Sequence, residues 1–227
     1  MGASESPLYS AVVFDIGNTL VRTVDSIESA YLQVFARHAI PAEKIQLFKR
    51  FAGRPKHFLF SEALGDIPRK SEVVRECMTE FEKILVEQAR HVAELPGASD
   101  CLRRLRSRGW RIAMASGFPR AVGKAILDRF GWDYPLVCDE DVKEHRPAPD
   151  PVLKACELMA VAPTEALVVG DTPQDVLSAR AAGACSIAVT TGKFTGEELA
   201  EHRPTFIISG LAELPDLLER EFSSPRG

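Results

Sequence analysis

The chain of 227 residues contains no long hydrophobic run, no cluster of basic residues and no closely spaced pair of cysteines. A membrane-spanning helix needs about 20 consecutive apolar residues, so we expect no transmembrane segment. A net charge of −4 without a basic patch argues against a general nucleic-acid binder. The five scattered cysteines favour buried free thiols over zinc ligands or disulfides. Residues 1–10 lack the basic start and apolar stretch of a signal peptide, and we expect a soluble, cytoplasmic protein.

What the chain does contain, after residue 95, is a regular alternation of strand and helix patterns. Short apolar runs predict strands, and apolar residues at helical spacing predict helices. The expected strands cover residues 111–115, 136–138, 166–169, 185–189 and 205–208. The expected helices cover residues 120–130 and begin near residues 150 and 173. This alternation predicts an α/β fold with a Rossmann-like parallel sheet and helices on both faces.

The segment from residue 21 to residue 94 follows a different pattern, because it is almost purely helical. Behind a possible N-cap at Asp25 or Ser26, apolar residues recur at helical spacing through Ile27 and Tyr31 to Phe35. A second such pattern covers residues 73–85. We therefore expect an all-helical cap domain inserted after the first strand. The predicted division is residues 8–20 and 95–222 for the core, 21–94 for the cap and 223–227 for a flexible tail.

The most informative single residue is Asp15, which follows the apolar run Val12-Val13-Phe14 and precedes a Gly-Asn-Thr turn. This pattern predicts a buried strand that delivers an acid to a loop. Open α/β sheets bind ligands at the carboxyl ends of their strands. An acid in this place would be costly to bury without a metal ion or strong hydrogen-bond donors. We therefore expect Asp15 to be functional.

Three further segments place polar groups at expected strand ends or in loops. Ser116 and Gly117 precede a helix, whose free N–H groups suit phosphate oxygens. Arg146 lies in His-Arg-Pro-Ala-Pro, and its planar guanidinium matches the geometry of a phosphoryl group. Asp171 and Asp175 lie in Gly-Asp-Thr-Pro-Gln-Asp, again at a strand end that leads into a helix.

Each of these residues also has a purely structural interpretation. Asp175 completes a capping box that begins at Thr172, so helix capping and a functional role are both open for it. Ser116 could simply terminate a strand. Arg146, taken alone, would be a solvated surface charge. The functional interpretation depends on the four segments occurring together.

In their order and separations, the four segments resemble the motifs of the haloacid dehalogenase superfamily, from Asp15 to about Leu218. The resemblance implies that Asp15 is a nucleophile that forms an aspartyl-phosphate. It also implies that Ser116 and Arg146 hold the phosphoryl group, Arg146 filling a position more often occupied by lysine. The implied cofactor is Mg²⁺, a hard cation that favours oxygen ligands and offsets the repulsion between carboxylate and phosphate. The implied metal-site residues are Asp15, Gly17 through its backbone carbonyl, Asp171 and Asp175. The implied substrate-binding residues are Asn18, Thr19, Arg54 and Gly117.

One position departs from the pattern of that superfamily. Most of its phosphatases carry a second Asp two residues after the nucleophile as a general acid, and this chain has Gly17 there. Loss of a general acid typically costs about 10²–10⁴-fold in rate. The motifs also resemble the phosphonatase-like branch, close to phosphoglycolate phosphatases, in which that Asp is absent as well. In true phosphonatases a cap lysine forms a Schiff base with phosphonoacetaldehyde, and Lys56 lies at a similar place. Such a lysine needs a lowered pKa, from burial or from a nearby cation such as Arg54.

The expected function is therefore Mg²⁺-dependent hydrolysis of a small phosphorylated or phosphonate metabolite through Asp15. C–P bond cleavage with a Schiff base on Lys56 is the second hypothesis, and an ordinary solvated or phosphate-steering lysine is at least an equal interpretation of Lys56. A haloacid dehalogenase and a non-catalytic binder of a phosphorylated ligand are further alternatives. We expect no nucleic-acid or membrane partner, and a monomer or a homodimer.

Overall fold

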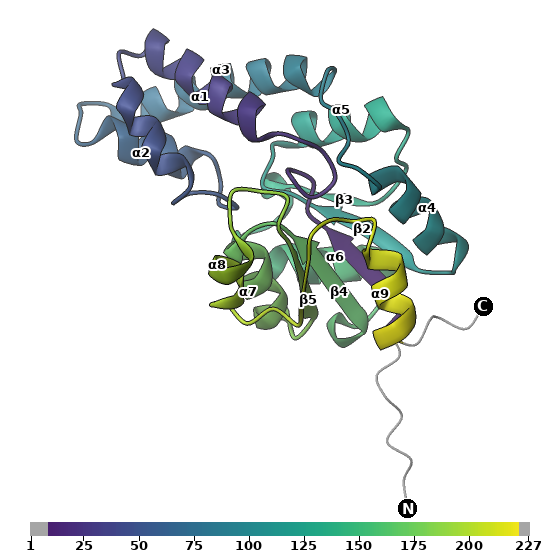
Figure 1. The fold of residues 1–227 in the computed structure, drawn as a ribbon. Coiled ribbons are helices and arrows are strands. Elements are labelled where there is room, and N and C mark those ends of the chain that lie inside the picture. Colours follow the sequence, from purple (N-terminus) through teal and green to yellow (C-terminus); the bar gives the residue numbers. More distant parts are fainter. Residues whose placement is uncertain (1–8, 223–227) are drawn as a thin grey trace, which may run out of the picture.

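The computed structural model describes residues 9–222, and its centre is a six-stranded parallel sheet in the order β3-β2-β1-β4-β5-β6 (Figure 1). The strands are β1 (Ala11–Phe14), β2 (Arg111–Ala115), β3 (Leu136–Val137), β4 (Ala166–Gly170), β5 (Cys185–Val189) and β6 (Phe206–Ile208). Phe14 at the end of β1 lies between Met114 of β2 and Val169 of β4. The carboxyl end of β1 is therefore at the middle of the sheet edge. The α/β fold predicted from the sequence is confirmed.

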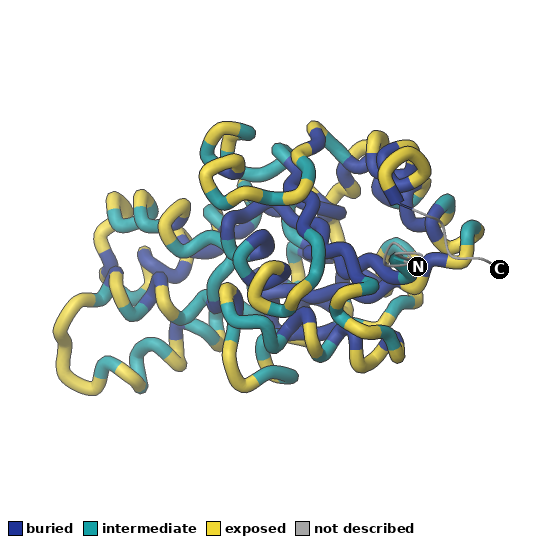
Figure 2. The backbone as a smooth tube through the Cα atoms, turned by 90° about the horizontal axis from the view of Figure 1, so that it is seen from below, coloured by how far each residue is buried: buried dark blue, intermediate teal, exposed yellow. Residues whose placement is uncertain are grey.

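Helices cover both faces of the sheet because successive side chains of a strand point to opposite sides. Val12 and Phe14 belong to a core shared with α4, α5 and α9, whereas Ala11 and Val13 belong to a core shared with α6 and α7. These helices are α4 (Ala98–Ser107), α5 (Arg120–Phe130), α6 (Asp150–Met159), α7 (Pro173–Ala182) and α9 (Leu214–Glu221), and a short α8 (Gly196–Ala200) follows β5. Figure 2 shows the buried residues gathered in the interior of the molecule and the exposed ones along its outer turns.

Between β1 and α4 the chain forms a separate helical layer, which we call the cap (residues 24–89). It contains α1 (Val24–Arg37), the 3₁₀ helix η1 (Ala42–Phe48), α2 (His57–Leu64) and α3 (Lys70–Ala89). Tyr31 lies at its centre, with ring centroids 4.4 Å from Phe81 and 5.0 Å from Phe60. This buried aromatic cluster gives the cap its own packed interior.

The two connections between the cap and the core run side by side. The N–H of Arg22 donates to the carbonyl of Ala93 at 2.9 Å, and the N–H of Leu95 donates to the carbonyl of Leu20 at 2.8 Å. These paired segments lie at the predicted boundaries near residues 21 and 94. The division into two domains at these residues stays a prediction.

Several local predictions differ from the structure, among them the ends of two strands, since β4 runs to Gly170 and β6 begins at Phe206. Helix α1 begins at Val24, so neither Asp25 nor Ser26 is its N-cap. Instead Asn18 accepts from the N–H groups of Thr23 and Val24 at 3.0 and 2.9 Å. Asn18 reaches them from a left-handed turn (φ +58°), a conformation that Asn tolerates better than most residues. The strand predicted over residues 136–138 ends one residue earlier, at Val137.

Three further expectations concern the cysteines, a membrane-spanning helix and the C-terminal tail. All five cysteines lie within the described residues as free thiols, and four of them are buried. Within residues 9–222, no helix has the length and apolar character needed to cross a membrane. The tail predicted at residues 223–227 lies outside the described residues, as does residue 8 of the predicted core.

Candidate active site

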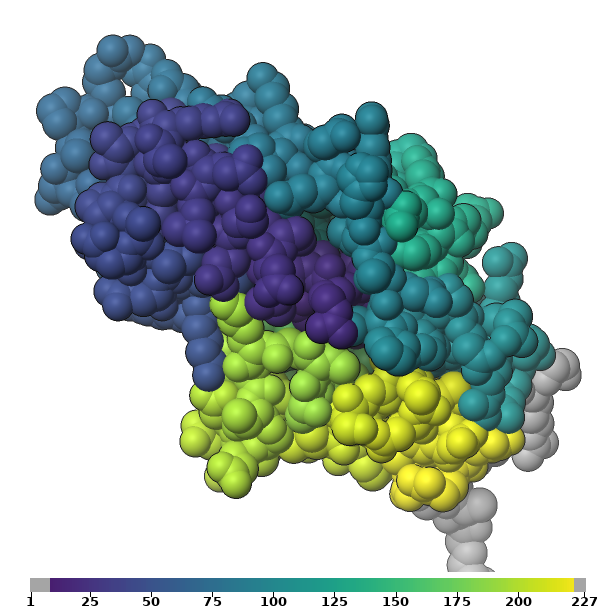
Figure 3. Space-filling model, turned by 45° about the horizontal axis from the view of Figure 1, so that its top comes forward, coloured from purple at the N-terminus to yellow at the C-terminus, as the bar shows by residue number. Residues whose placement is uncertain are grey.

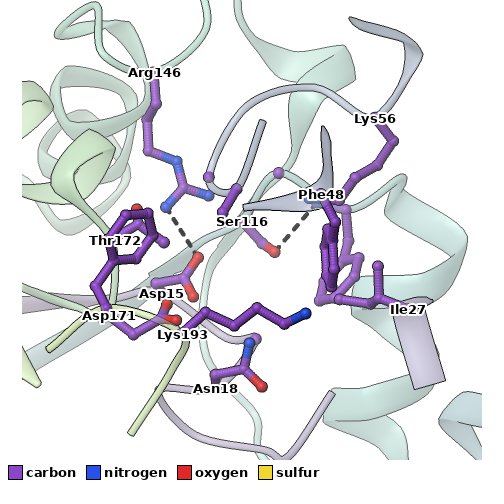
Figure 4. Close-up of a pocket in the computed structure, with 16 residues that line it drawn as sticks. Asp15, Asn18, Ile27, Phe48, Lys56, Ser116, Arg146, Asp171, Thr172 and Lys193 are labelled. Atoms are coloured by element: carbon purple, nitrogen blue, oxygen red, sulfur yellow. Dashed lines mark hydrogen bonds and ion pairs between the residues drawn. The ribbon is translucent and has the colours of Figure 1, made fainter. Parts of the chain in front are cut away.

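Four loops that follow parallel strands meet at one edge of the sheet and line a narrow cavity of about 50 Å³ beneath the cap (Figure 4). Asp15 follows β1, Ser116 follows β2, Asp171 follows β4 and Lys193 lies in the loop after β5. The N–H of Asp15 still donates to the carbonyl of Val169 at 2.9 Å, so the sheet fixes its backbone. The cavity is therefore built where an open α/β sheet binds ligands.

Arg146 lines this cavity and is buried between two carboxylates. Its Nη1 donates to Asp15 Oδ1 at 2.9 Å and also to Asp175 Oδ1. Burial raises the pKa of Asp15 to about 6, and the nearby Arg146 opposes this increase. Burial alone would lower the pKa of Arg146, but Asp175 and Asp15 outweigh it and the pKa is raised. The guanidinium is therefore a permanent cation beside the expected nucleophile.

Asp175 connects this ion pair to the start of helix α7. Its Oδ2 accepts from the N–H of Thr172 at 3.1 Å and from Thr172 Oγ1 at 2.6 Å, so the predicted capping box is present. Its Oδ1 accepts from Arg146. Both oxygens of Asp175 thus have protein partners, and its contacts position Arg146 and cap α7.

Ser116 and Gly117 lie at the end of β2 and line the same cavity. Ser116 Oγ accepts from the N–H of Phe118 at 3.2 Å, which orients the hydroxyl (Figure 4). A Cβ on Gly117 would lie 3.4 Å from Arg146 Nη2, so glycine keeps this wall close to the guanidinium. Hydroxyl, guanidinium and backbone amides together form a set of donors suited to phosphoryl oxygens.

The donor set at Asp15 and Asp171 suits a hard divalent cation. Both residues are buried and line the cavity, as does Gly17. Burial raises the pKa of Asp171 well above its usual value, and the neighbouring Asp15 and Asp175 add to the increase. A bound cation would relieve this crowding of carboxylates. Within residues 9–222 no three His, Cys, Asp or Glu side chains are grouped to hold a metal by themselves. A site here therefore depends on two carboxylates together with backbone or solvent oxygens, which suits Mg²⁺.

Lys56 reaches the cavity from the cap, just before helix α2. Its Nζ lies 3.4 Å from the carbonyl oxygen of Arg54 and 5.5 Å from the centre of the Phe118 ring. Burial lowers the pKa of Lys56; Asp139 opposes this decrease and Arg146 adds to it. A nucleophilic lysine needs a lowered pKa, and the pKa of Lys56 is shifted in this direction, mainly by burial.

The space beside Gly17 is occupied by other side chains. A Cβ on Gly17 would lie 3.0 Å from Thr23 Oγ1 and 3.3 Å from two carbons of the Phe118 ring. Contacts of 3.0–3.4 Å are tighter than most real Cβ contacts, so a neighbour would have to shift. Phe118 thus stands next to the position where related phosphatases carry their general acid.

Most of the side chains singled out from the sequence lie together, and some do not. Asp15, Gly17, Asn18, Lys56, Ser116, Gly117, Arg146 and Asp171 line the cavity. Thr19 is fully buried and is not part of the lining. The side chain of Arg54 is not part of the lining either, although its carbonyl oxygen faces Gly117. Asp175 lies behind Arg146, outside the lining.

Sequence reasoning assigned no role to several other residues of the lining, above all Lys193 and Phe48. Lys193 had a usable signal, since it follows an expected strand just as Asp15, Ser116 and Asp171 do. Phe48 had none, because its position depends on how the cap packs onto the core.

Comparisons with known proteins agree with this arrangement. A family model described as haloacid dehalogenase-like hydrolase matches residues 9–183. A candidate pyrophosphatase named PpaX, from Caldanaerobacter subterraneus subsp. tengcongensis, is 30% identical over 92% of this chain and 94% of its own. Phosphoglycolate phosphatase 1 of Pseudomonas aeruginosa is 27% identical over 89% of this chain and 77% of its own. The crystal structure of a hydrolase from Pseudomonas syringae has the same fold, with a TM-score of 0.82 and 21% identity, over 94% of this chain and 99% of the other. The chain belongs to the haloacid dehalogenase-like hydrolases.

Proposed function

We propose that this protein is a Mg²⁺-dependent phosphatase that hydrolyses a small phosphate monoester through a phosphorylated Asp15. The observation that carries the proposal is the buried Asp15, which lines one cavity together with Ser116, Arg146 and Asp171. Two relatives, named as a phosphoglycolate phosphatase and a candidate pyrophosphatase, carry the names of enzymes for small phosphorylated compounds.

The chemistry follows from the positions of these side chains. Ser116, the amide groups near Gly117 and the guanidinium of Arg146 hold the phosphoryl oxygens, and an oxygen of Asp15 attacks phosphorus. The bond between phosphorus and the leaving oxygen breaks, and water then hydrolyses the aspartyl-phosphate to release phosphate. Asp15, Asp171 and the backbone carbonyl of Gly17 would hold Mg²⁺, whose charge reduces the repulsion between the carboxylate and the substrate. The cap covers the cavity and limits access of bulk water.

Arg146 must change partners for this chemistry to occur. In the structure its Nη1 is bound to Asp15 and Asp175. A phosphoryl group has negative oxygens that compete for the guanidinium, and Asp15 is then free to act as the nucleophile. Asp175 keeps its contacts with Thr172 and still anchors the arginine.

Cleavage of a C–P bond is the second candidate, and the lowered pKa of Lys56 is the observation that favours it. The Lys56 amine lines the same cavity as Asp15, so an imine formed with a phosphonoaldehyde would lie beside the nucleophile. This reaction leaves an enamine on the carbon side, so the missing acid at Gly17 costs nothing. A phosphate ester, by contrast, must leave without that acid or take a proton from another donor.

The test is phosphate release, with and without Mg²⁺, from a panel of small phosphate esters that also contains phosphonoacetaldehyde. We expect ester hydrolysis that stops in EDTA and falls to background in Asp15→Asn. Asp128→Asn is the matched control, because it makes the same change at an exposed carboxylate paired with Lys124 and should keep full activity. Undiminished turnover in Asp15→Asn would exclude Asp15 as the nucleophile. Release from phosphonoacetaldehyde alone, lost in Lys56→Arg, would establish the second candidate instead.

A further inference from the structure

Lys193 is a cavity residue of the core to which neither the motifs nor the proposed reaction gives a role. It lies in the loop between β5 and α8, and two contacts fix the backbone before it. Thr191 Oγ1 donates to the carbonyl oxygen of Asn18 at 2.5 Å. Gly192 lies so close to Asp171 that a Cβ there would overlap the carboxylate. The loop is therefore held against both the Asp15 loop and the expected metal site, and Lys193 starts from a fixed position.

From this position the side chain of Lys193 extends toward the cap. Its Nζ is 2.5 Å from Glu28 Oε2 on α1 and 4.2 Å from the centre of the Phe48 ring on η1. The ion pair is partly open to solvent, since the side chains are 29% and 36% exposed. Ion pairs of this kind are weak and exchange readily. An anion inside the cavity can therefore displace Glu28 from the ammonium group.

The part of the cavity that Lys193 reaches is not the part that holds the phosphoryl group. Figure 4 shows its ammonium group pointing toward Phe48 and Ile27, on the side away from Arg146. The leaving part of a substrate bound at Asp15 would occupy this region. Its walls are largely apolar, and Lys193 and Lys56 are its cationic side chains. A short leaving group that carries a negative charge fits both properties.

We propose that Lys193 is a substrate-binding residue that selects compounds carrying a second anionic group, a carboxylate or a phosphate, on the leaving side of the phosphoryl group. The inference rests on the proposed function for the placement of the phosphoryl end at Asp15. In the structure Glu28 pairs with the ammonium group. When substrate enters, the second anion takes the place of Glu28, and the cation–π contact with Phe48 holds the lysine in position.

Lys49 provides a matched comparison within the same chain. It belongs to the cap, and its Nζ lies 2.6 Å from Glu198 Oε1 on core helix α8 and 5.2 Å from the centre of the Phe194 ring. Like Lys193, it joins cap and core through one carboxylate and one aromatic ring. Lys49 does not line the cavity. Figure 3 shows the cap lying directly against the core segment around residues 190–200, where both pairs occur.

The experiment is isothermal titration calorimetry in the presence of Mg²⁺ with two ligands that cannot be hydrolysed. 3-Phosphonopropionate carries a phosphonate and a carboxylate, whereas propylphosphonate has the same length without the second charge. We expect the unsubstituted protein to bind 3-phosphonopropionate about 10- to 100-fold more tightly, the range expected of a hydrogen bond to a charged group. Lys193→Met should reduce this preference to about threefold or less, and Lys49→Met should leave it unchanged. Methylenediphosphonate, as a third ligand, distinguishes a second phosphate from a carboxylate.

The proposal is overturned if the unsubstituted protein shows no preference, or if Lys193→Met retains it. A loss of affinity for all three ligands in Lys193→Met would also contradict it, because that result indicates a role in cap closure only. Circular dichroism checks that both variants are folded. Calorimetry needs no turnover, so a failure of the proposed phosphatase activity would appear separately, as absent phosphate release.

Discussion

Gly17 shows how much a single residue can decide in this site. Restoring the acid that most related phosphatases carry, by Gly17→Asp, should lower activity. The new Cβ would lie 3.3 Å from the Phe118 ring and 3.0 Å from Thr23 Oγ1, and overpacking of this kind costs about 1–3 kcal/mol. We expect a lower free energy of unfolding in urea and a reduced kcat for phosphate release.

The double variant Gly17→Asp with Phe118→Ala is the control for this explanation, because it removes the obstructing ring. It should recover part of the lost kcat, and Phe118→Ala alone should not. A rise in kcat for Gly17→Asp alone would contradict the argument, since it would mean that the ring yields to a carboxylate at no cost.

Some residues of the site could be predicted from the sequence, and others could not. Asp15, Ser116 and Asp171 were predictable, because each follows a strand and parallel strands end at one edge. The hydrogen bonds from Arg146 to both Asp15 and Asp175 were not predictable, because they depend on side-chain directions within a buried cluster. The resemblance implied Thr19 and Arg54 as substrate-binding residues, and neither side chain lines the cavity.

Among the contacts between elements, the cap loop before α2 packs closely against the start of core helix α7. Gly53 lies there with φ +74°, and a Cβ on it would lie 2.5 Å from Thr172 Oγ1 and 2.9 Å from Gln174 Cβ. Gly53→Ala should therefore hold the loop away from the core, raise KM and lower kcat/KM by about tenfold or more, because a displacement of about 1 Å can cost 10²-fold. Steady-state kinetics of phosphate release measures the effect.

Gly183→Ala is the matched control for Gly53→Ala. Gly183 has nearly the same φ, +77° against +74°, but no atom lies within 4 Å of the position that a Cβ would take there. Both variants carry the strain of an alanine at positive φ, roughly 1 kcal/mol. Only Gly53→Ala adds a collision with the core. Equal losses of activity in the two variants would show that strain, and not cap–core contact, is responsible.

Elements were predicted more accurately than their contacts. The strands at 111–115 and 185–189 and the helix at 120–130 match the structure, because apolar periodicity and flanking glycines mark them directly. The start of α1 was misplaced, because Asn18 caps it from five and six residues away, where no local capping pattern reveals it. The docking of η1 and the Gly53 loop onto the core depends on packing between distant segments, which one sequence does not specify.

Buried thiols in both the cap and the core should make the whole molecule less stable at alkaline pH. Burial raises the pKa of Cys101 and Cys138 to about 12 and that of Cys77 and Cys156 to about 11, from an ordinary value of 9.0. The folded protein therefore keeps these protons while the unfolded chain releases them. Their contribution to stability is complete below pH 9 and is lost progressively as the pH rises from 9 to 12. Each thiol removes up to about 1.4 kcal/mol per pH unit within this window.

Urea denaturation at pH 7.5, 9.5 and 10.5 measures this slope directly. Because Cys77 lies in the cap and Cys101, Cys138 and Cys156 lie in the core, we expect both parts to lose stability together. Cys101→Ala lowers stability at every pH by removing buried volume, but its decrease above pH 9 should be shallower than that of the unsubstituted protein. An identical slope with and without Cys101 would show that its thiol ionises alike in both states, and that burial does not control the alkaline limit of this fold.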